Sequence, residues 1–436
     1  MALIVAAACT SGPQAGPPRA VDASASVPSA PEATVATGPA TTPAPASPAT
    51  PSAAVLSGEM APIDFRELAL DRGIHQGTVY TERRISLAGG ASAGAVASGS
   101  WTSEWVELPF AFTRLVPSWN GATPDGTWLR VEMQARRASG GETRWWSFGT
   151  WAAGDADVRR ASLEGQSDGD GRVDTDTFEA ASPMSAYRMR VVLERRSPAE
   201  PPPAIGLLAA VASDPSRFAP RIPSAAGAAA GRELPVPGYS QEIHAGAYPE
   251  YDGGGEAWCS PTSTAMVLAY WKTGPTPAEL SWVDPRYPDP QVAHAARFTF
   301  DAAYGGTGNW PFNTAYAARY GLRGFVTQLR SLAEAERFIA AGIPLIASVK
   351  VAPGALPGFL LPQGTNGHLL VISGFTAAGD VVSHDPAATS NESVRRVYPR
   401  AAFEKAWLEG SRGTVYVIHP PTLALPERVP GAAANW

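Results

Sequence analysis

Residues 258–271 read WCSPTSTAMVLAYW and combine a single cysteine with the start of a predicted helix. Ser260 and Thr262 can cap this helix, Pro261 suits its first turn, and the small and aliphatic residues that follow repeat at i, i+3 and i+4. The helix macrodipole and the unpaired N–H groups at a helix start favour the thiolate form of a cysteine. We therefore predict that Cys259 is a nucleophile. The alternative is a buried structural cysteine, since a free cysteine behaves as a small apolar residue.

Composition limits the classes of function. The chain has 436 residues, enough for two domains, and a net charge of -6 without a basic tract that would bind nucleic acid. No apolar run is long enough to span a membrane. Two cysteines cannot build a disulfide framework, and they and the six histidines lack metal-ligand spacing. No phosphate-binding glycine loop is evident, so we expect neither a metal nor a nucleotide cofactor.

The N-terminus predicts export. Residues 1–9, MALIVAAAC, resemble the end of a bacterial lipoprotein signal peptide, in which the cysteine, here Cys9, carries the lipid. The stretch departs from that pattern because it lacks a positively charged start and has Ala6 where leucine is usual. Residues 10–57 are almost entirely Ala, Pro, Ser, Thr, Gly and Val, a composition expected to form a disordered tether. The alternatives are an incidental apolar N-terminus and a generic linker.

Residues 63–213 predict an all-β sandwich of the jelly-roll kind. Short segments such as 101–108, 127–135 and 187–194 alternate apolar and polar residues between turn signals. Seven tryptophans fall in this region, and exposed ones could stack on sugar rings. We therefore consider a cell-wall or glycan contact for this domain, although most tryptophans in such strands face the core. The seven are Trp101, Trp105, Trp119, Trp128, Trp145, Trp146 and Trp151.

An Ala/Gly-rich linker, residues 214–232, precedes a second domain over 233–420, and 421–436 follow as a C-terminal tail. Helices are predicted from Cys259 to about residue 271, over 314–320 and over 331–341. Strands are predicted over 344–349, 368–375, 381–385 and 414–418. Early helices followed by an antiparallel sheet indicate an α+β domain.

Four segments of this second domain resemble the papain-like cysteine peptidases of the C39-like group, in the branch found as secreted stand-alone domains. In order they read VPGYSQ at 236–241, WCSPTS at 258–263, NGHLLVISGF at 366–375 and SHDP at 383–386. The resemblance covers about residues 233–420. It implies a papain-like fold and a thiol-dependent peptidase. The sequence departs from the usual Gly-Pro after the nucleophile, since Ser260 precedes Pro261.

The resemblance assigns a role to each motif. It implies that Cys259 attacks a carbonyl, that His368 acts as general base and then acid, and that Asp385 orients the imidazole. It also implies that Gln241 donates a side-chain N–H in an oxyanion hole, beside the Cys259 backbone N–H. Asp385 before a proline is also a common turn residue. His384 and Asn391 are alternatives for the orienting position.

Two loops are candidates for the walls of a substrate cleft. One runs from His244 to Trp258 and includes three consecutive glycines, and the other spans residues 304–311. Trp258 and Trp310 are the residues we expect to contact substrate. The alternative for both loops is an ordinary solvent-exposed connection.

The expected protein is a secreted or lipid-anchored bacterial cysteine hydrolase that cleaves a peptide or related amide through a thioester. The family's transporter-linked members cut leader peptides after paired glycines, but this chain has neither their membrane spans nor their nucleotide-binding domain. Two alternatives remain. One is a papain-like acyltransferase or amidase, and the other is a catalytically inactive surface-binding module.

Overall fold

The computed structural model describes residues 62–88, 96–218, 223–429 and 431–436. These residues belong to one compact unit. Cys9 and the predicted tether 10–57 lie outside them. None of the helices described is long and apolar enough to cross a bilayer.

The N-terminal region is all-β, as predicted, and we call residues 63–213 the β domain. Its twelve strands form one connected antiparallel sheet that is close to a barrel, in place of two separate sandwich layers. The path runs β2-β5-β11-β6-β12-β4-β3, and the other strands pair along its sides. The strands are β1 (Ile63–Glu67), β2 (Ile74–Gln76), β3 (Thr78–Thr81), β4 (Arg84–Leu87), β5 (Ala97–Thr102), β6 (Val106–Ala122), β7 (Thr127–Arg137), β8 (Trp146–Trp151), β9 (Ser167–Asp168), β10 (Gly171–Asp174), β11 (Thr177–Arg195) and β12 (Ala204–Ser213).

Two long strands explain why the sheet is continuous. Strand β6 has 17 residues and β11 has 19, and β11 pairs with β10, β6, β7 and β5 along its length. Register shifts at Met184 interrupt the pairing with β6 and β7. Such bulges bend a strand and increase its twist, so one strand can serve neighbours on two sides of a closing sheet.

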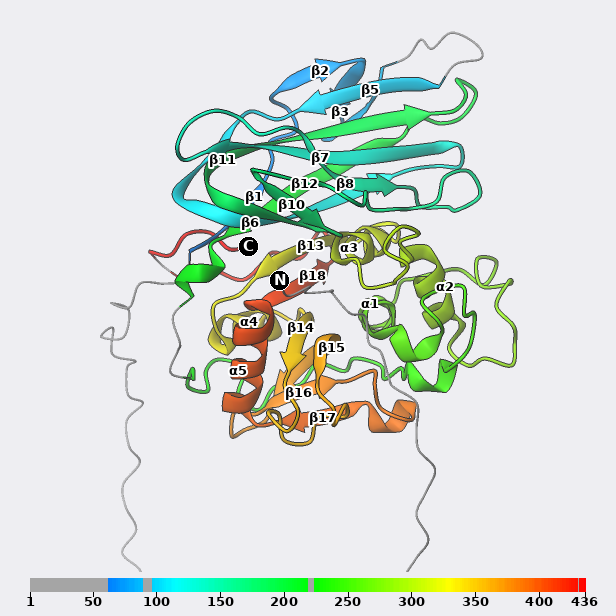
Figure 1. The fold of residues 1–436 in the computed structure, drawn as a ribbon. Coiled ribbons are helices and arrows are strands. Elements are labelled where there is room, and N and C mark those ends of the chain that lie inside the picture. The colour runs from blue at the N-terminus through cyan, green and yellow to red at the C-terminus, as the bar shows by residue number, and fades with distance from the viewer. Residues whose placement is uncertain (1–61, 89–95, 219–222, 430) are drawn as a thin grey trace, which may run out of the picture. The chain divides into compact units, whose positions relative to one another are not determined.

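The C-terminal region combines helices with an antiparallel sheet, as predicted (Figure 1). Its six strands follow the order β13-β18-β14-β15-β16-β17. The helices are α1 (Cys259–Tyr270), α2 (Pro290–Thr299), α3 (Trp310–Ala318), α4 (Leu332–Ala340) and α5 (Arg400–Ser411). The strands are β13 (Arg323–Gln328), β14 (Leu345–Val351), β15 (Thr365–Phe375), β16 (Val381–His384), β17 (Arg395–Tyr398) and β18 (Thr414–His419). Three helices come first, but β13 precedes α4, and α5 lies between β17 and β18. Short 3₁₀ turns cover Pro215–Arg217, Glu242–His244, Gly255–Ala257 and Asn391–Ser393.

Helix starts differ from the expectation in two places. Helix α1 begins at Cys259 with Trp258 as its cap residue, and no side chain caps it. Ser260 instead shares a hydrogen bond of 2.9 Å with the Tyr416 hydroxyl. Helix α3 begins four residues earlier than predicted because the Asn309 side chain accepts the Phe312 N–H and caps it.

The two regions share one hydrophobic core. Phe312 of α3 packs against Trp119 of β6 and Trp151 of β8, with ring centroids 6.0 and 5.4 Å apart. The Asn120 amide bridges to strand β13, where it donates to the Gly324 carbonyl and accepts the Gly324 N–H. The β domain is therefore held against the C-terminal region by apolar packing and by hydrogen bonds.

The linker and the tail also pack on this unit. Gly231 of the linker donates its N–H to the Thr376 carbonyl, directly after β15. At the other end of the chain, Trp436 is buried against Phe338 of α4, and the N–H of Phe65 in β1 donates to the Ala434 carbonyl. Residues 431–436 thus contact both regions.

Candidate active site

Cys259 is the only free cysteine among the residues that the structure describes, and it is 4% exposed at the first position of α1. The helix packs against β15, and the Ser263 hydroxyl donates to the Leu369 carbonyl. That bond lies one turn from Cys259 on the helix and one residue from His368 on the strand. It sets the distance between the two elements that carry the thiol and the imidazole.

His368 is completely buried and is hydrogen-bonded to two of the residues predicted for the site. Its Nε2 lies 2.7 Å from Asp385 Oδ1, and its side chain is hydrogen-bonded to that of Cys259. Because Asp385 occupies Nε2, Nδ1 is the ring nitrogen that remains for the thiol. Burial alone would disfavour the imidazolium, but the charge of Asp385 and these hydrogen bonds outweigh it and raise the pKa of His368.

Asp385 follows directly after β16 and is also fully buried. It accepts hydrogen bonds from His368, from the Ala387 N–H at 3.0 Å and from the Tyr398 hydroxyl at 2.6 Å. Burial opposes its ionisation, yet the His368 charge and these donors together lower the pKa of Asp385. The buried carboxylate is thus satisfied and ionised.

Tyr398, at the end of β17, was not singled out in the sequence. Its ring is buried and its hydroxyl has a pKa raised first by burial and then by Asp385, so it stays a donor to that carboxylate. The alternatives for the orienting position lie elsewhere. His384 contacts Ser373, and Asn391 donates to Asp289 and accepts the Ser240 N–H.

Gln241 is buried next to the loop that ends at Cys259. Its backbone N–H donates to the Pro386 carbonyl, so its segment is anchored beside Asp385. Its side-chain nitrogen donates to the Glu256 carbonyl at 2.7 Å and to Glu242 Oε1 at 3.2 Å. The half-buried Glu242 has a raised pKa, chiefly through burial.

The two predicted wall loops are joined to each other. Asp252 accepts hydrogen bonds from the Thr307 N–H and hydroxyl, at 2.9 and 3.1 Å. At Gly255 a Cβ atom would lie 2.4 Å from the Gln241 carbonyl oxygen, so a glycine is needed for this close approach. Trp258 is fully buried, with its ring near His244 and its Nε1–H donated to the Tyr251 carbonyl. It lies beneath the surface and does not line the cleft.

A cleft of about 560 Å³ opens beside the thiol. Cys259 and Trp310 line it, together with residues from β14, β15 and the end of α5. The β domain supplies another wall through β6 and the β10–β11 hairpin, which the sequence did not indicate. The lining residues from the C-terminal region include Ala257, Tyr304, Gly308, Ser348, Val349, Lys350, Asn366, Gly367, Leu369 and Arg412.

The tryptophans of the β domain divide into two groups. Trp101, Trp119, Trp146 and Trp151 are buried, whereas Trp105, Trp128 and Trp145 are partly exposed. Arginines cover two of the partly exposed rings: Arg136 and Arg188 stack on Trp105, and Arg188 and Arg190 stack on Trp145. The Trp128 Nε1–H donates to Glu194.

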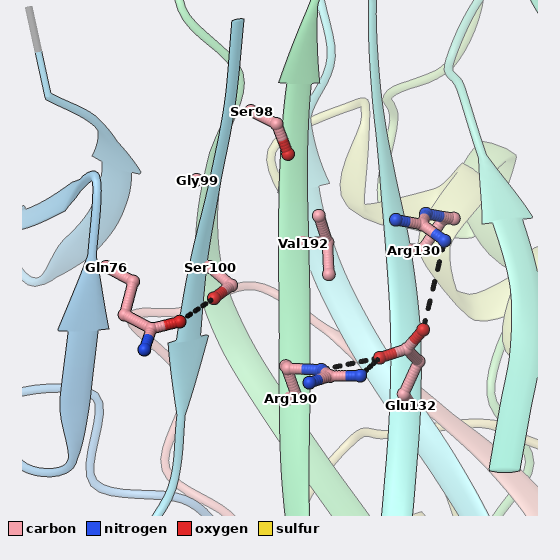
Figure 2. A pocket seen from close by; sticks show the side chains of 8 residues that line it. All are labelled: Gln76, Ser98, Gly99, Ser100, Arg130, Glu132, Arg190 and Val192. Carbon is pink, nitrogen blue, oxygen red and sulfur yellow. Dashed lines mark hydrogen bonds and ion pairs between the residues drawn. The ribbon is translucent and has the colours of Figure 1, made fainter. Parts of the chain in front are cut away.

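A second, polar cavity of about 420 Å³ lies on β5, β7 and β11 of the β domain. Figure 2 shows Glu132 between Arg130 and Arg190, and Gln76 hydrogen-bonded to Ser100. The described residues contain no cluster of His, Cys, Asp and Glu that could hold a metal ion.

Comparisons with known proteins agree with this division into two regions. Residues 66–213 match the model of the peptidase C39 N-terminal domain, and residues 233–415 match the model of the peptidase C39-like family. No curated protein matches the chain.

One solved structure, of the Gt strain of infectious bursal disease virus, matches at 10% identity with a TM-score of 0.17. The match covers 39% of this chain and 43% of that one. A similarity this low supports no conclusion about fold or function.

Proposed function

We propose that this chain, which belongs to the C39-like peptidase family, is a cysteine peptidase that hydrolyses a peptide or related amide through a thioester. The observation that carries the proposal is the buried His368, which is hydrogen-bonded to Asp385 on one side and to Cys259 on the other. A raised His368 pKa favours an imidazolium beside the thiol, and an imidazolium stabilises the thiolate.

In the acylation step, the Cys259 thiolate attacks the carbonyl carbon of the substrate and forms a C–S bond. The tetrahedral oxyanion then collapses, the C–N bond breaks, and His368 gives its Nδ1 proton to the leaving amine. In deacylation His368 accepts a proton from water while the hydroxide attacks the thioester. The carboxylic acid leaves, and the thiolate and imidazolium are restored.

The oxyanion needs hydrogen-bond donors, and we infer that two residues supply them. The Cys259 backbone N–H is at the start of α1, where helical N–H groups have no partner within the helix. Gln241 would supply the second donor. Its longer hydrogen bond, to Glu242 at 3.2 Å, is the one that an oxyanion would replace.

The test uses the full chain and a library of internally quenched peptides, with cleavage products identified by mass spectrometry. Wild type should cleave a subset of the library, and Cys259→Ala and His368→Ala should cleave none of it. Added hydroxylamine should trap the acyl group as a hydroxamate if the thioester accumulates. Transfer to a peptide amine at low concentration, with no hydrolysis product formed, would identify an acyltransferase. Intact activity in Cys259→Ala would refute the proposal.

Export and anchoring are a separate proposal, supported by residues 1–57 alone. We propose that the protein acts outside the cytoplasm, tethered through Cys9. Metabolic labelling with an alkyne-bearing palmitate in a bacterial host should mark wild type and spare Cys9→Ser.

The second candidate function, a surface-binding module, is favoured by the polar cavity of Figure 2. Its hydroxyl, amide and charged groups are of the kind that bind sugar hydroxyls. Binding of Cys259→Ala to purified peptidoglycan, lost in Arg190→Ala, would support a glycan contact. A protein that stays in the supernatant would argue against it.

A further inference from the structure

The wall of the active-site cleft that comes from the β domain is not used by the proposed chemistry. Strand β6 and the β10–β11 hairpin line the same cavity as Cys259. A cavity wall next to the nucleophile contacts whatever substrate occupies that cavity. The β domain therefore has a place in substrate recognition as well as in the shared core.

The hairpin is fixed in position by its turn. Asp176 is 8% exposed and its Oδ2 accepts the Trp310 N–H at 2.7 Å, at the start of α3. Arg114 of β6 lies over the ring of the same Trp310, 5.7 Å from its centroid. Thr175 has a φ of 54°, the left-handed conformation of a tight turn. The hairpin cannot move away from the cleft without breaking the hydrogen bond between Asp176 and Trp310.

The acidic side chains on this wall of the cleft differ in whether they have a hydrogen-bond or ion-pair partner. Asp174, Asp176 and Glu179 all act electrostatically on the buried guanidinium of Arg114. Asp176 accepts the Trp310 N–H at the start of α3, and Glu179 forms an ion pair with Arg172. The Asp174 side chain makes no hydrogen bond or ion pair with another described residue, although the residue is half-buried. Burial, and then the neighbouring Glu179, raise the pKa of Asp174, and the charges of Arg172 and Arg114 only partly offset this rise.

We propose that Asp174, at the turn of the β10–β11 hairpin, selects substrates by binding a cationic group close to the bond that Cys259 attacks. The group is an ammonium or guanidinium, from a basic side chain or from the free amino terminus of the peptide. The proposal rests on the proposed peptidase function. Lys350 and Arg412 line the cleft from β14 and the end of α5, and Arg114 lines it from β6.

The experiment measures covalent inactivation of the full chain by acetylated tripeptidyl chloromethyl ketones. Lysine, norleucine or glutamate is placed at each of the three positions in turn. Norleucine has nearly the shape of lysine without the charge. A matched set with free amino termini tests the second source of the cation. The rate with iodoacetamide, which needs no subsite, reports the state of the thiol independently.

At one of the three peptide positions, the reagent with lysine should inactivate wild type about tenfold faster than the reagent with norleucine, as expected for a partly buried ion pair. In Asp174→Asn this ratio should fall to about one, with the iodoacetamide rate unchanged. Asp168→Asn is the matched control, because Asp168 lies on the adjacent strand β9 and does not line the cleft. If the free amino terminus is the cation, the preference should appear only in the unacetylated set.

The outcomes separate the two proposals. Equal rates for lysine and norleucine in wild type, or a lysine preference that survives Asp174→Asn, would overturn the subsite while leaving the peptidase intact. A faster glutamate reagent would also overturn it. A thiol that reacts with neither class of reagent would overturn the proposed function itself.

Discussion

Replacing Asp385 by asparagine tests the central electrostatic claim about the site. Asparagine keeps an oxygen that can accept the Nε2–H of His368, but it removes the charge that raises the His368 pKa. Burial, which alone lowers that pKa, is then opposed chiefly by the hydrogen bond and charge of Cys259. The imidazolium becomes less stable, so a Cys259 thiolate loses its counter-charge. The pKa of the Cys259 thiol should therefore rise.

The size of the effect follows from the contact. A hydrogen bond to a charged group contributes about 1.5–3 kcal/mol, and 1.36 kcal/mol corresponds to one pKa unit. The acid limb of the alkylation profile should therefore move to higher pH by about one to two units. Below the thiolate pKa, the rate at a fixed pH should fall by about 10- to 100-fold.

The assay follows iodoacetamide labelling of Cys259 by mass spectrometry from pH 4 to 9. Asp380→Asn is the control, because Asp380 precedes the same strand β16 that Asp385 follows, and it accepts the Arg400 N–H at 3.0 Å. Thermal melting verifies that both variants are folded. An Asp385→Asn profile that superimposes on wild type would refute the electrostatic coupling described for the site.

Three further substitutions test the surroundings of the candidate active site. Tyr398→Phe removes the 2.6 Å donor to Asp385 and should destabilise the fold by about 1.5–3 kcal/mol in denaturant titrations, while alkylation slows by less than roughly tenfold. Asp176 has a pKa raised by burial from 3.8 to about 6, so its contribution to stability is present below 3.8 and is lost as the pH rises through 6. Asp176→Asn should therefore raise the melting temperature at pH 8, through a gain of up to about 3 kcal/mol in the free energy of unfolding. At pH 3.5 the melting temperature should not change, and an equal gain at both pH values would contradict this. Trp310→Ala should slow inactivation by peptidyl reagents about tenfold without changing the iodoacetamide rate of Cys259, since its ring lines the cleft.

Much of the C-terminal region was predictable because its signals are local. The apolar stripe after Cys259, and the strands that carry His368 and precede Asp385, follow from short patterns, and the structure has helix α1 and strands β15 and β16 there. Helix α3 was predicted to start too late. The Asn309-Trp310-Pro311 sequence is itself a start signal, with a capping side chain followed by a proline in the first turn.

Other features depend on contacts that no local pattern encodes. Tyr398 lies in a strand of four residues and meets Asp385 only because β17 pairs with β16. The β10–β11 hairpin reaches the cleft through docking between regions distant in sequence. The predicted pair of sandwich layers was also too simple. Alternation of apolar and polar residues indicates which face of a strand is buried, but it does not indicate which strands pair with one as long as β11.

The packing of Phe312 between Trp119 and Trp151 has a consequence for biosynthesis. A ribosome completes the β domain well before it adds residue 312. Until then the two indole rings have no partner from α3, and the nascent chain presents an apolar surface to the cell. Chains of this size are prone to aggregate from such intermediates. Slow translation or early termination between the two regions would thus expose a surface that the finished protein buries.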